Sequence, residues 1–181
     1  MLFIILNIIN KLRRRNLFVK SLHDLDPEQE VAIEVQRKGI GEVLFTMKKQ
    51  VYAAKLLLKF LSAQPTFVRA APQVYKYFEL SENNLPKSAV SNILVRFKVS
   101  KSWLSARQIP PKAIVLKRYD ARSWQELPTK VVDEDSQAVY FEAKLPSFSY
   151  YAITVRESYP EKIAEPLLKK KEKPAAYLTL N

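Results

Sequence analysis

The sequence predicts an all-β protein, an antiparallel β-sandwich of about 8–10 strands with a short helical turn near residues 101–107. Short apolar segments alternate with period two along most of residues 26–155; in 30–37, for example, Val31, Ile33 and Val35 share one face. Sequences rich in Pro, Asn, Asp and Ser separate these segments at regular intervals. Only 2 glycines accompany 11 prolines, so these other residues must turn the chain.

Residues 1–25 are interpreted as a separate apolar and basic segment. An apolar run is followed by KLRRR, and three interpretations remain open. In the first, the segment is an N-terminal helix at a membrane interface, with Arg13, Arg14 and Arg15 as candidate contacts to anionic headgroups. In the second, it is an end piece packed on the domain. In the third, it is a non-native start to a longer reading frame. The apolar run is about half of the roughly 20 residues that span a membrane. His23 is expected in a solvated connector.

The first half of the domain is expected to contain strands over 30–37, 43–47, 52–60 and 73–80. The segment 48–63 is rich in Ala, Lys and Leu, which also fits a helix. Its neighbours alternate, and Pro65 closes it at strand length. We therefore predict a strand in its second half.

The second half is expected to contain strands over 92–99, 113–119, 123–127, 129–132, 138–144 and 148–155. Ser100 is placed to cap a helical turn, because its hydroxyl can accept from open backbone N–H groups. Pro110 and Pro111 then end that turn, and Trp103 is expected to close one end of the sandwich. Residues 156–181 are rich in Pro and Lys and are expected to form an extended tail.

Several kinds of chemistry are excluded by composition. The chain has no cysteine and one histidine, so disulfides, thiolate nucleophiles and zinc sites built from Cys or several His cannot form. Two glycines cannot supply a glycine-rich phosphate loop. The acidic run 133–135 lacks the spacing of a calcium loop and is interpreted as a solvated turn. We predict no cofactor, no metal and no catalytic activity.

Nucleic-acid binding is disfavoured despite a net charge of +12. Arg96 and Lys98 alternate with Phe97 and Val99, so a strand places the two cations on its solvent face and the apolar residues in the core. The basic residues of this stretch therefore fit an ordinary outer face of a sandwich better than a phosphate-binding groove.

Several stretches carry a family resemblance: VYKYFEL at 74–80, ILVRFKVSKSWL at 93–104, VLKRY at 115–119, WQELPT at 124–129, VYFEA at 139–143 and PSFSYYAI at 146–153. Their order and spacing resemble the PGF-pre-PGF domain of archaeal cell-surface proteins, over about residues 26–155. The residues that carry the motif are Tyr75, Tyr77, Phe97, Trp103, Leu104, Tyr119, Trp124, Leu127, Pro128, Phe148, Ser149 and Tyr151.

The resemblance implies an extracellular, non-enzymatic β-rich module with a structural or interaction role at the cell envelope. Its expected partners are other cell-surface proteins or domains, with contact to a membrane surface through residues 1–20. A second interpretation is a cytoplasmic or membrane-peripheral protein whose basic N-terminal segment contacts anionic lipid or nucleic acid. KLRRR and the lack of a signal peptide of normal order favour this second interpretation.

Overall fold

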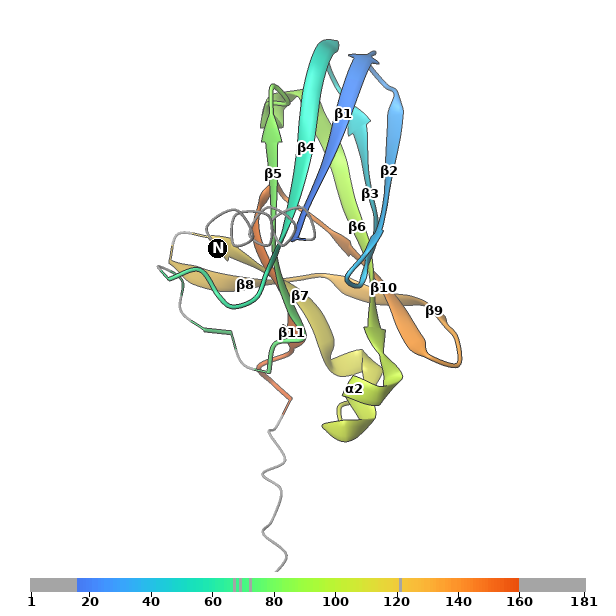
Figure 1. Ribbon diagram of the computed structural model, residues 1–181, viewed down its shortest axis with the longest axis vertical. Coiled ribbons are helices and arrows are strands. Elements are labelled where there is room, and N and C mark those ends of the chain that lie inside the picture. The colour runs from blue at the N-terminus through green and yellow to red at the C-terminus, as the bar shows by residue number, and fades with distance from the viewer. Residues whose placement is uncertain (1–15, 67, 69, 72, 121, 160–181) are drawn as a thin grey trace, which may run out of the picture.

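Two antiparallel sheets packed face to face form the protein in the computed structural model, which describes residues 16–66, 68, 70–71, 73–120 and 122–159 (Figure 1). The strands are β1 (Leu17–Leu25), β2 (Glu30–Arg37), β3 (Ile40–Met47), β4 (Val51–Leu61), β5 (Lys76–Asn83), β6 (Val90–Ser100), β7 (Ile114–Asp120), β8 (Ser123–Leu127), β9 (Thr129–Glu134), β10 (Ala138–Lys144) and β11 (Ser149–Val155). The six-stranded sheet has the order β1-β4-β5-β11-β7-β8, and the five-stranded sheet has the order β2-β3-β6-β10-β9. The predicted fold class is confirmed.

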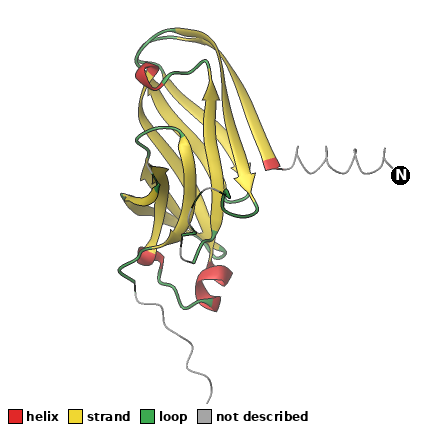
Figure 2. Ribbon diagram, turned by 90° about the vertical axis from the view of Figure 1, so that its left-hand side faces the viewer, coloured by secondary structure: helices red, strands yellow, loops and turns green. Residues whose placement is uncertain are grey.

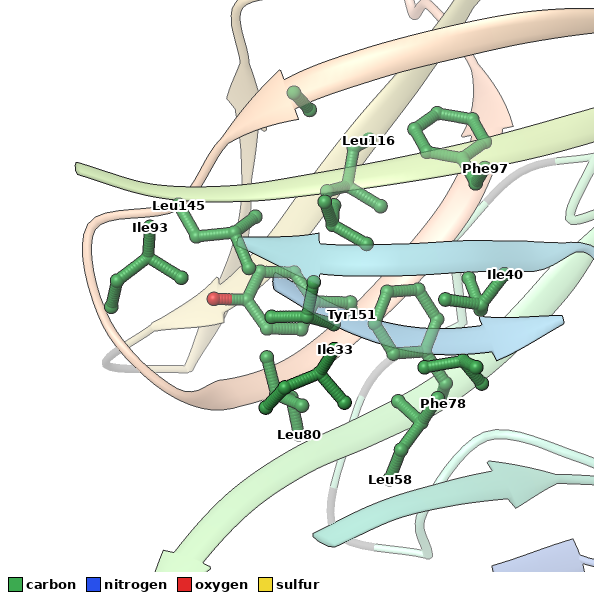
Figure 3. Packing of buried hydrophobic residues seen from close by; sticks show 14 of the residues in the cluster. Ile33, Ile40, Leu58, Phe78, Leu80, Ile93, Phe97, Leu116, Leu145 and Tyr151 are labelled. Carbon is green, nitrogen blue, oxygen red and sulfur yellow. The ribbon is translucent and has the colours of Figure 1, made fainter. Parts of the chain in front are cut away.

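The core lies between the two sheets, because the alternating apolar residues of each sheet point toward the other. The inward residues predicted on β2 and β6 are all buried: Val31, Ile33, Val35, Ile93, Val95, Phe97 and Val99. Figure 3 shows Ile33 and Ile40 of the five-stranded sheet beside Phe78 and Tyr151 of the six-stranded sheet. Burial of these apolar surfaces is the main stabilising contribution to the fold.

The sandwich begins earlier in the chain than the expected boundary at residue 26. Residues 17–25 form β1, an edge strand that pairs with β4 from Leu17 opposite Lys59 to Leu25 opposite Val51. The prediction of a connector around His23 was therefore wrong, and His23 is an exposed strand residue. The apolar alternation that would predict this strand is weak in the sequence, because only Leu22 and Leu25 of the strand are buried. Residues 1–15, including Arg13–Arg15, lie outside the described residues.

The segment 48–63, with its helical propensity, forms a strand over Val51–Leu61 and no helix. β4 spans Val51–Leu61 and pairs with both β1 and β5. Its alternate residues Leu56, Leu58 and Phe60 are buried, so burial of one face outweighs the helical preference of its Ala, Lys and Leu residues.

The short helix α2 (Lys101–Ala106) forms where the sequence predicts it, at the lower end of the sandwich (Figure 2). The Ser100 hydroxyl accepts from the Trp103 backbone N–H at 3.3 Å, and this satisfies one of the open donors of the first turn. Two 3-10 turns, η1 (Lys87–Ala89) and η2 (Pro111–Ala113), precede β6 and β7.

Replacing Ser100 with alanine is expected to lower the free energy of unfolding by about 1 kcal/mol, because the Trp103 N–H loses its acceptor. Urea unfolding monitored by circular dichroism measures the change. The control is Ser105→Ala at an exposed position of the same helix, which should change stability by less than about 0.5 kcal/mol. Equal effects of the two substitutions would show that the cap contributes nothing.

A connector covers part of the outer face of the six-stranded sheet. Residues 62–75 link β4 to β5, and within this connector Val68 and Ala71 are buried. The Ala71 N–H donates to the Tyr77 hydroxyl at 3.2 Å, and the Tyr75 N–H donates to the Ile153 carbonyl at 2.8 Å. Residues on both faces of β7 and β11 are consequently buried.

The chain after β11 remains in contact with the sandwich as far as Tyr159, so the expected tail does not begin at residue 156. The Arg156 N–H donates to the Ala113 carbonyl at 2.8 Å. The half-buried Tyr159 packs against the core, and its hydroxyl donates to the Gln108 carbonyl at 3.2 Å. Residues 160–181 lie outside the described residues.

Candidate anion-binding surface

The predicted motif residues lie in packing positions at three places in the sandwich. Phe97 stacks on Phe141 with ring centroids 5.3 Å apart, and Tyr151 stacks on Phe78 at the same distance. Burial raises the pKa of the Tyr151 hydroxyl above its usual range, and this hydroxyl donates to the Ser147 carbonyl. These side chains belong to the core.

The two tryptophans are half-buried, and Trp103, on the helix α2 at one end of the sandwich, packs against the core as expected. Trp103 packs edge-on against Tyr75 at 5.1 Å, and the Arg107 guanidinium lies 4.7 Å from its ring centroid. Trp124 lies between Tyr119 and Tyr77 on the outer face of the six-stranded sheet, at centroid distances of 5.4 and 5.9 Å.

Of the remaining motif residues, all but Pro128 pack against or bond to the sandwich. Leu104 is buried, and Leu127 and Phe148 are half-buried against the core. Pro128 is exposed where the chain passes from β8 to β9. The Ser149 hydroxyl donates to the Tyr119 carbonyl at 2.9 Å and so joins β11 to β7.

A row of ion pairs crosses the outer face of the five-stranded sheet. Glu42, Arg96, Glu142 and Lys130 lie opposite one another on β3, β6, β10 and β9. Arg96 contacts Glu42 at 2.6 Å and Glu142 at 2.9 Å, while Lys130 contacts Glu142 at 2.8 Å. The bonds from Lys130 and Arg96 lower the pKa of the Glu142 carboxyl. Cation and carboxylate neutralise each other along this row, as in other cross-strand charge pairs.

Next to this row, the β2–β3 hairpin forms one wall of a pocket of about 220 Å³, hereafter the hairpin pocket. It is lined by residues 36–42 together with Arg96, Phe97, Lys98 and Tyr140. Gly39 has φ +91°, and a Cβ added there would meet the Lys98 carbonyl at 3.1 Å. The glycine thus allows the hairpin to approach β6, where the Lys98 N–H donates to the Gly39 carbonyl at 2.7 Å.

The hairpin pocket is electropositive. Its lining includes Arg37, Lys38, Arg96 and Lys98, and Glu42 is the only acid among the described residues that line it. Glu42 and Glu142 both pair with Arg96, and Asp135 beside the pocket interacts with Lys98, so the excess positive charge of the lining comes from Arg37 and Lys38. Such a surface attracts anionic groups.

The tip of the hairpin also places two of these cations, Arg37 and Lys38, over aromatic rings of the six-stranded sheet. The Arg37 guanidinium lies 5.6 Å from the centroid of Phe18, and the Lys38 ammonium lies 5.7 Å from that of Phe60. Lys38 also donates to the Asn16 side chain. We call Arg37, Lys38 and the nearby Lys76 the cationic end. Burial, and then the charge of Lys38, lowers the pKa of Lys76.

The expected turn over the acidic run 133–135 was wrong for its first two residues, because Asp133 and Glu134 end the strand β9 and only Asp135 lies in the turn to β10. Asp135 accepts from the Gln137 and Ala138 N–H groups at 2.7 Å each and from the Tyr140 hydroxyl at 2.6 Å. The Tyr140 hydroxyl, and then the two N–H groups, lower the pKa of Asp135 to about 2. Among the described residues, no group of three or more acids or histidines is arranged to hold a metal ion.

In the Tyr140→Phe variant, the NMR titration midpoint of the Asp135 carboxyl is expected to rise from about 2 toward its ordinary value of about 3.9. The lowered pKa means that the stabilisation by Asp135 is fully present above about pH 4 and is lost as pH falls through about 2. In the variant the folded-state pKa lies closer to the unfolded-state value, so this contribution is smaller and is completely lost at a higher pH. The control is Tyr52→Phe, whose hydroxyl donates to Gln50 instead and which should leave the midpoint unchanged.

A second cavity lies beside α2. It has a volume of about 500 Å³ and is lined by Leu104, Ile109, Pro110, Val139 and Tyr159, among others. Lys101 and Glu134 at its rim pair with each other at 2.5 Å. The cation and the carboxylate of this lining thus balance each other.

Sequence reasoning identified Arg96 and Lys98 as outward-facing but missed the hairpin pocket. The pocket depends on an irregularity, a register shift between Glu34 and Arg37 on β2. The left-handed conformations of Gln36, Lys38 and Gly39 accompany it. The one signal in the sequence is the RKGIG stretch at 37–41, in which two cations precede a glycine.

No family model matches the chain, and no curated protein or solved structure shows significant similarity to it. None of the helices in the described part of the chain is both long and apolar enough to span a membrane. The similarity to the PGF-pre-PGF domain remains a prediction from the sequence.

Proposed function

We propose that this chain is a non-enzymatic β-sandwich module that acts by binding at the cell envelope, as part of an archaeal cell surface. The resemblance to the PGF-pre-PGF domain supports the location. The hairpin pocket with its adjoining cationic end supports binding, because it gathers cations around a concave surface whose only described lining acid is already paired. This is the observation that carries the proposal.

The carboxylates near this surface support a binding role over a catalytic one. Hydrogen bonds lower the pKa of both Asp135 and Glu142, so the two groups stay ionised at neutral pH. A general acid or base works best with a pKa near the working pH, and the shifts of these groups go the other way. Carboxylates that stay ionised are suited to pairing with cations and to recognition by charge.

Cell fractionation and protease treatment of intact cells test the location. Cells that express the full chain with a C-terminal epitope tag are expected to lose the tag when external protease is added, while a cytosolic marker protein stays intact. Tag found only in the cytosolic fraction would overturn the cell-surface proposal.

A second candidate function is that of a membrane-peripheral protein on the cytoplasmic side. The cationic end favours it, because Asn16, which Lys38 contacts, directly follows the KLRRR run in the sequence. The same fractionation distinguishes the two: protease-resistant tag in the membrane fraction supports the cytoplasmic side.

A further inference from the structure

The strand β1 and its neighbour β4 present apolar side chains to solvent on the outer face of the six-stranded sheet. Of the five large apolar side chains exposed in the described residues, Leu17, Val19 and Tyr52 lie on these two strands. Val19 is 47% exposed, and its register partner on β4 is the half-buried Leu57. The apolar residues at the start of β1 therefore form a small continuous strip.

Cations border this strip along β4. Lys59 lies opposite Leu17, and Lys55 lies opposite Ser21. Both lysines are exposed, and Lys59 makes one loose ion pair, at 4.0 Å, with Glu79. The long aliphatic stems of lysines can lie along an apolar surface while their ammonium groups reach outward. We call Leu17, Val19, Leu57, Lys55 and Lys59 the β1 face.

The cationic end lies at the first residues of the same strand. Arg37 lies over Phe18, and Lys38 contacts both Asn16 and Phe60. Lys76 lies close enough to Lys38 for the charge of Lys38 to add to the effect of burial in lowering its pKa.

The sequence adds further cations at this point through chain connectivity alone. Arg13, Arg14 and Arg15 immediately precede Asn16.

From these observations we propose that the β1 face and the cationic end dock on an anionic lipid bilayer. Phosphate headgroups meet Lys55 and Lys59 on the outer face, and they meet Arg37 and Lys38 around the free edge of β1, where these two cations lie over the inward-facing Phe18 and Phe60. Leu17 and Val19 enter the interfacial region. The proposal names the partner for the binding role proposed above and rests on that role, but it holds for either side of a membrane. An exposed apolar strip bordered by cations matches a bilayer interface, whereas a nucleic acid would use the cations alone.

Co-sedimentation with vesicles tests this proposal on the purified full chain. Vesicles of phosphatidylcholine with about a third phosphatidylglycerol are expected to bind the protein, and binding should weaken as salt is raised. Neutral phosphatidylcholine vesicles should bind it far less. Equal binding to both kinds of vesicle would overturn the proposed role of charge.

Two variants with matched controls locate the contact. Val19→Asp should weaken vesicle binding roughly 10-fold or more, since it removes apolar contact and adds repulsion. Val131→Asp is the control, because Val131 has the same 47% exposure on the edge strand β9 of the other sheet. Equal binding by the two variants would overturn the assignment of the β1 face.

The double variant Arg37→Ser with Lys38→Ser should weaken binding roughly 25-fold, about 5-fold for each cation removed. Lys87→Ser with Lys144→Ser removes the same charge from exposed positions elsewhere and should change binding much less. Thermal melting of every variant verifies folding. A labelled single-stranded oligonucleotide serves as the alternative partner. If the protein binds this oligonucleotide and does not bind the vesicles, the proposal is overturned.

Failure of this test is distinguishable from failure of the proposed location. Vesicle binding uses purified protein, whereas location is read from whole cells. A surface-exposed protein that does not bind vesicles would retain the envelope role and lose the lipid partner.

Discussion

Replacing Phe97 with alanine lowers the free energy of unfolding by about 3–5 kcal/mol. Phe97 is 1% exposed and stacks on Phe141, which lies directly opposite it on β10, with an angle of 13° between the rings. Truncation leaves a cavity between two sheets whose backbones are fixed by hydrogen bonds and cannot easily close it. Urea unfolding should show a lower midpoint with an unchanged slope.

The control for this substitution is Tyr52→Ala, which also removes a ring from a strand. Tyr52 is 68% exposed, so its loss should change the free energy of unfolding by about 0.5 kcal/mol or less. A change below about 1 kcal/mol for Phe97→Ala would contradict the close packing of the two phenylalanines.

The second large effect concerns Lys117, whose side chain is fully buried on β7. Its ammonium contacts Glu157 at 2.6 Å and Glu126 at 3.6 Å. Replacing both glutamates with alanine should lower the free energy of unfolding by about 3 kcal/mol or more, because a buried charge then loses both of its carboxylate partners. Chemical denaturation of the double variant measures the effect.

Removing the lysine instead should cost far less. In Lys117→Met, the aliphatic chain still fills the site, and no buried cation has to be desolvated. Glu157 and Glu126 are 70% and 35% exposed and can be hydrated. We expect a change within about 1 kcal/mol. A loss as large as that of the double glutamate variant would show that the ion pair itself, and not the isolated charge, determines stability.

The strands with one buried face were predictable from residue alternation. β2 and β6 follow the expected ranges closely, since Val31–Val35 and Ile93–Val99 alternate strictly. β1 was missed because its outward positions also carry apolar residues, Leu17 and Val19, and this hides the period of two. The burial of Lys117 was not predictable either, because it depends on long-range contacts with Glu126 and Glu157 that the local pattern does not contain.

The candidate site was less predictable than the fold. The outward direction of Arg96 and Lys98 follows from strand periodicity, but their neighbours across the sheet depend on register. The hairpin pocket requires the shift near Arg37 and the left-handed turn at Lys38–Gly39. Lysine adopts such a conformation rarely, so no local preference indicates it.

The position of β11 has a consequence for how the protein is made. β11 is the last strand along the described chain, yet it lies between β5 and β7 in the middle of its sheet. Until residues 149–155 have been synthesised, the three-stranded piece β1-β4-β5 and the hairpin β7-β8 share no backbone hydrogen bonds within that sheet. Pairings between such distant segments also form slowly. A nascent chain on the ribosome therefore cannot complete the sandwich step by step, and we expect folding in a single late transition, with no stable N-terminal half.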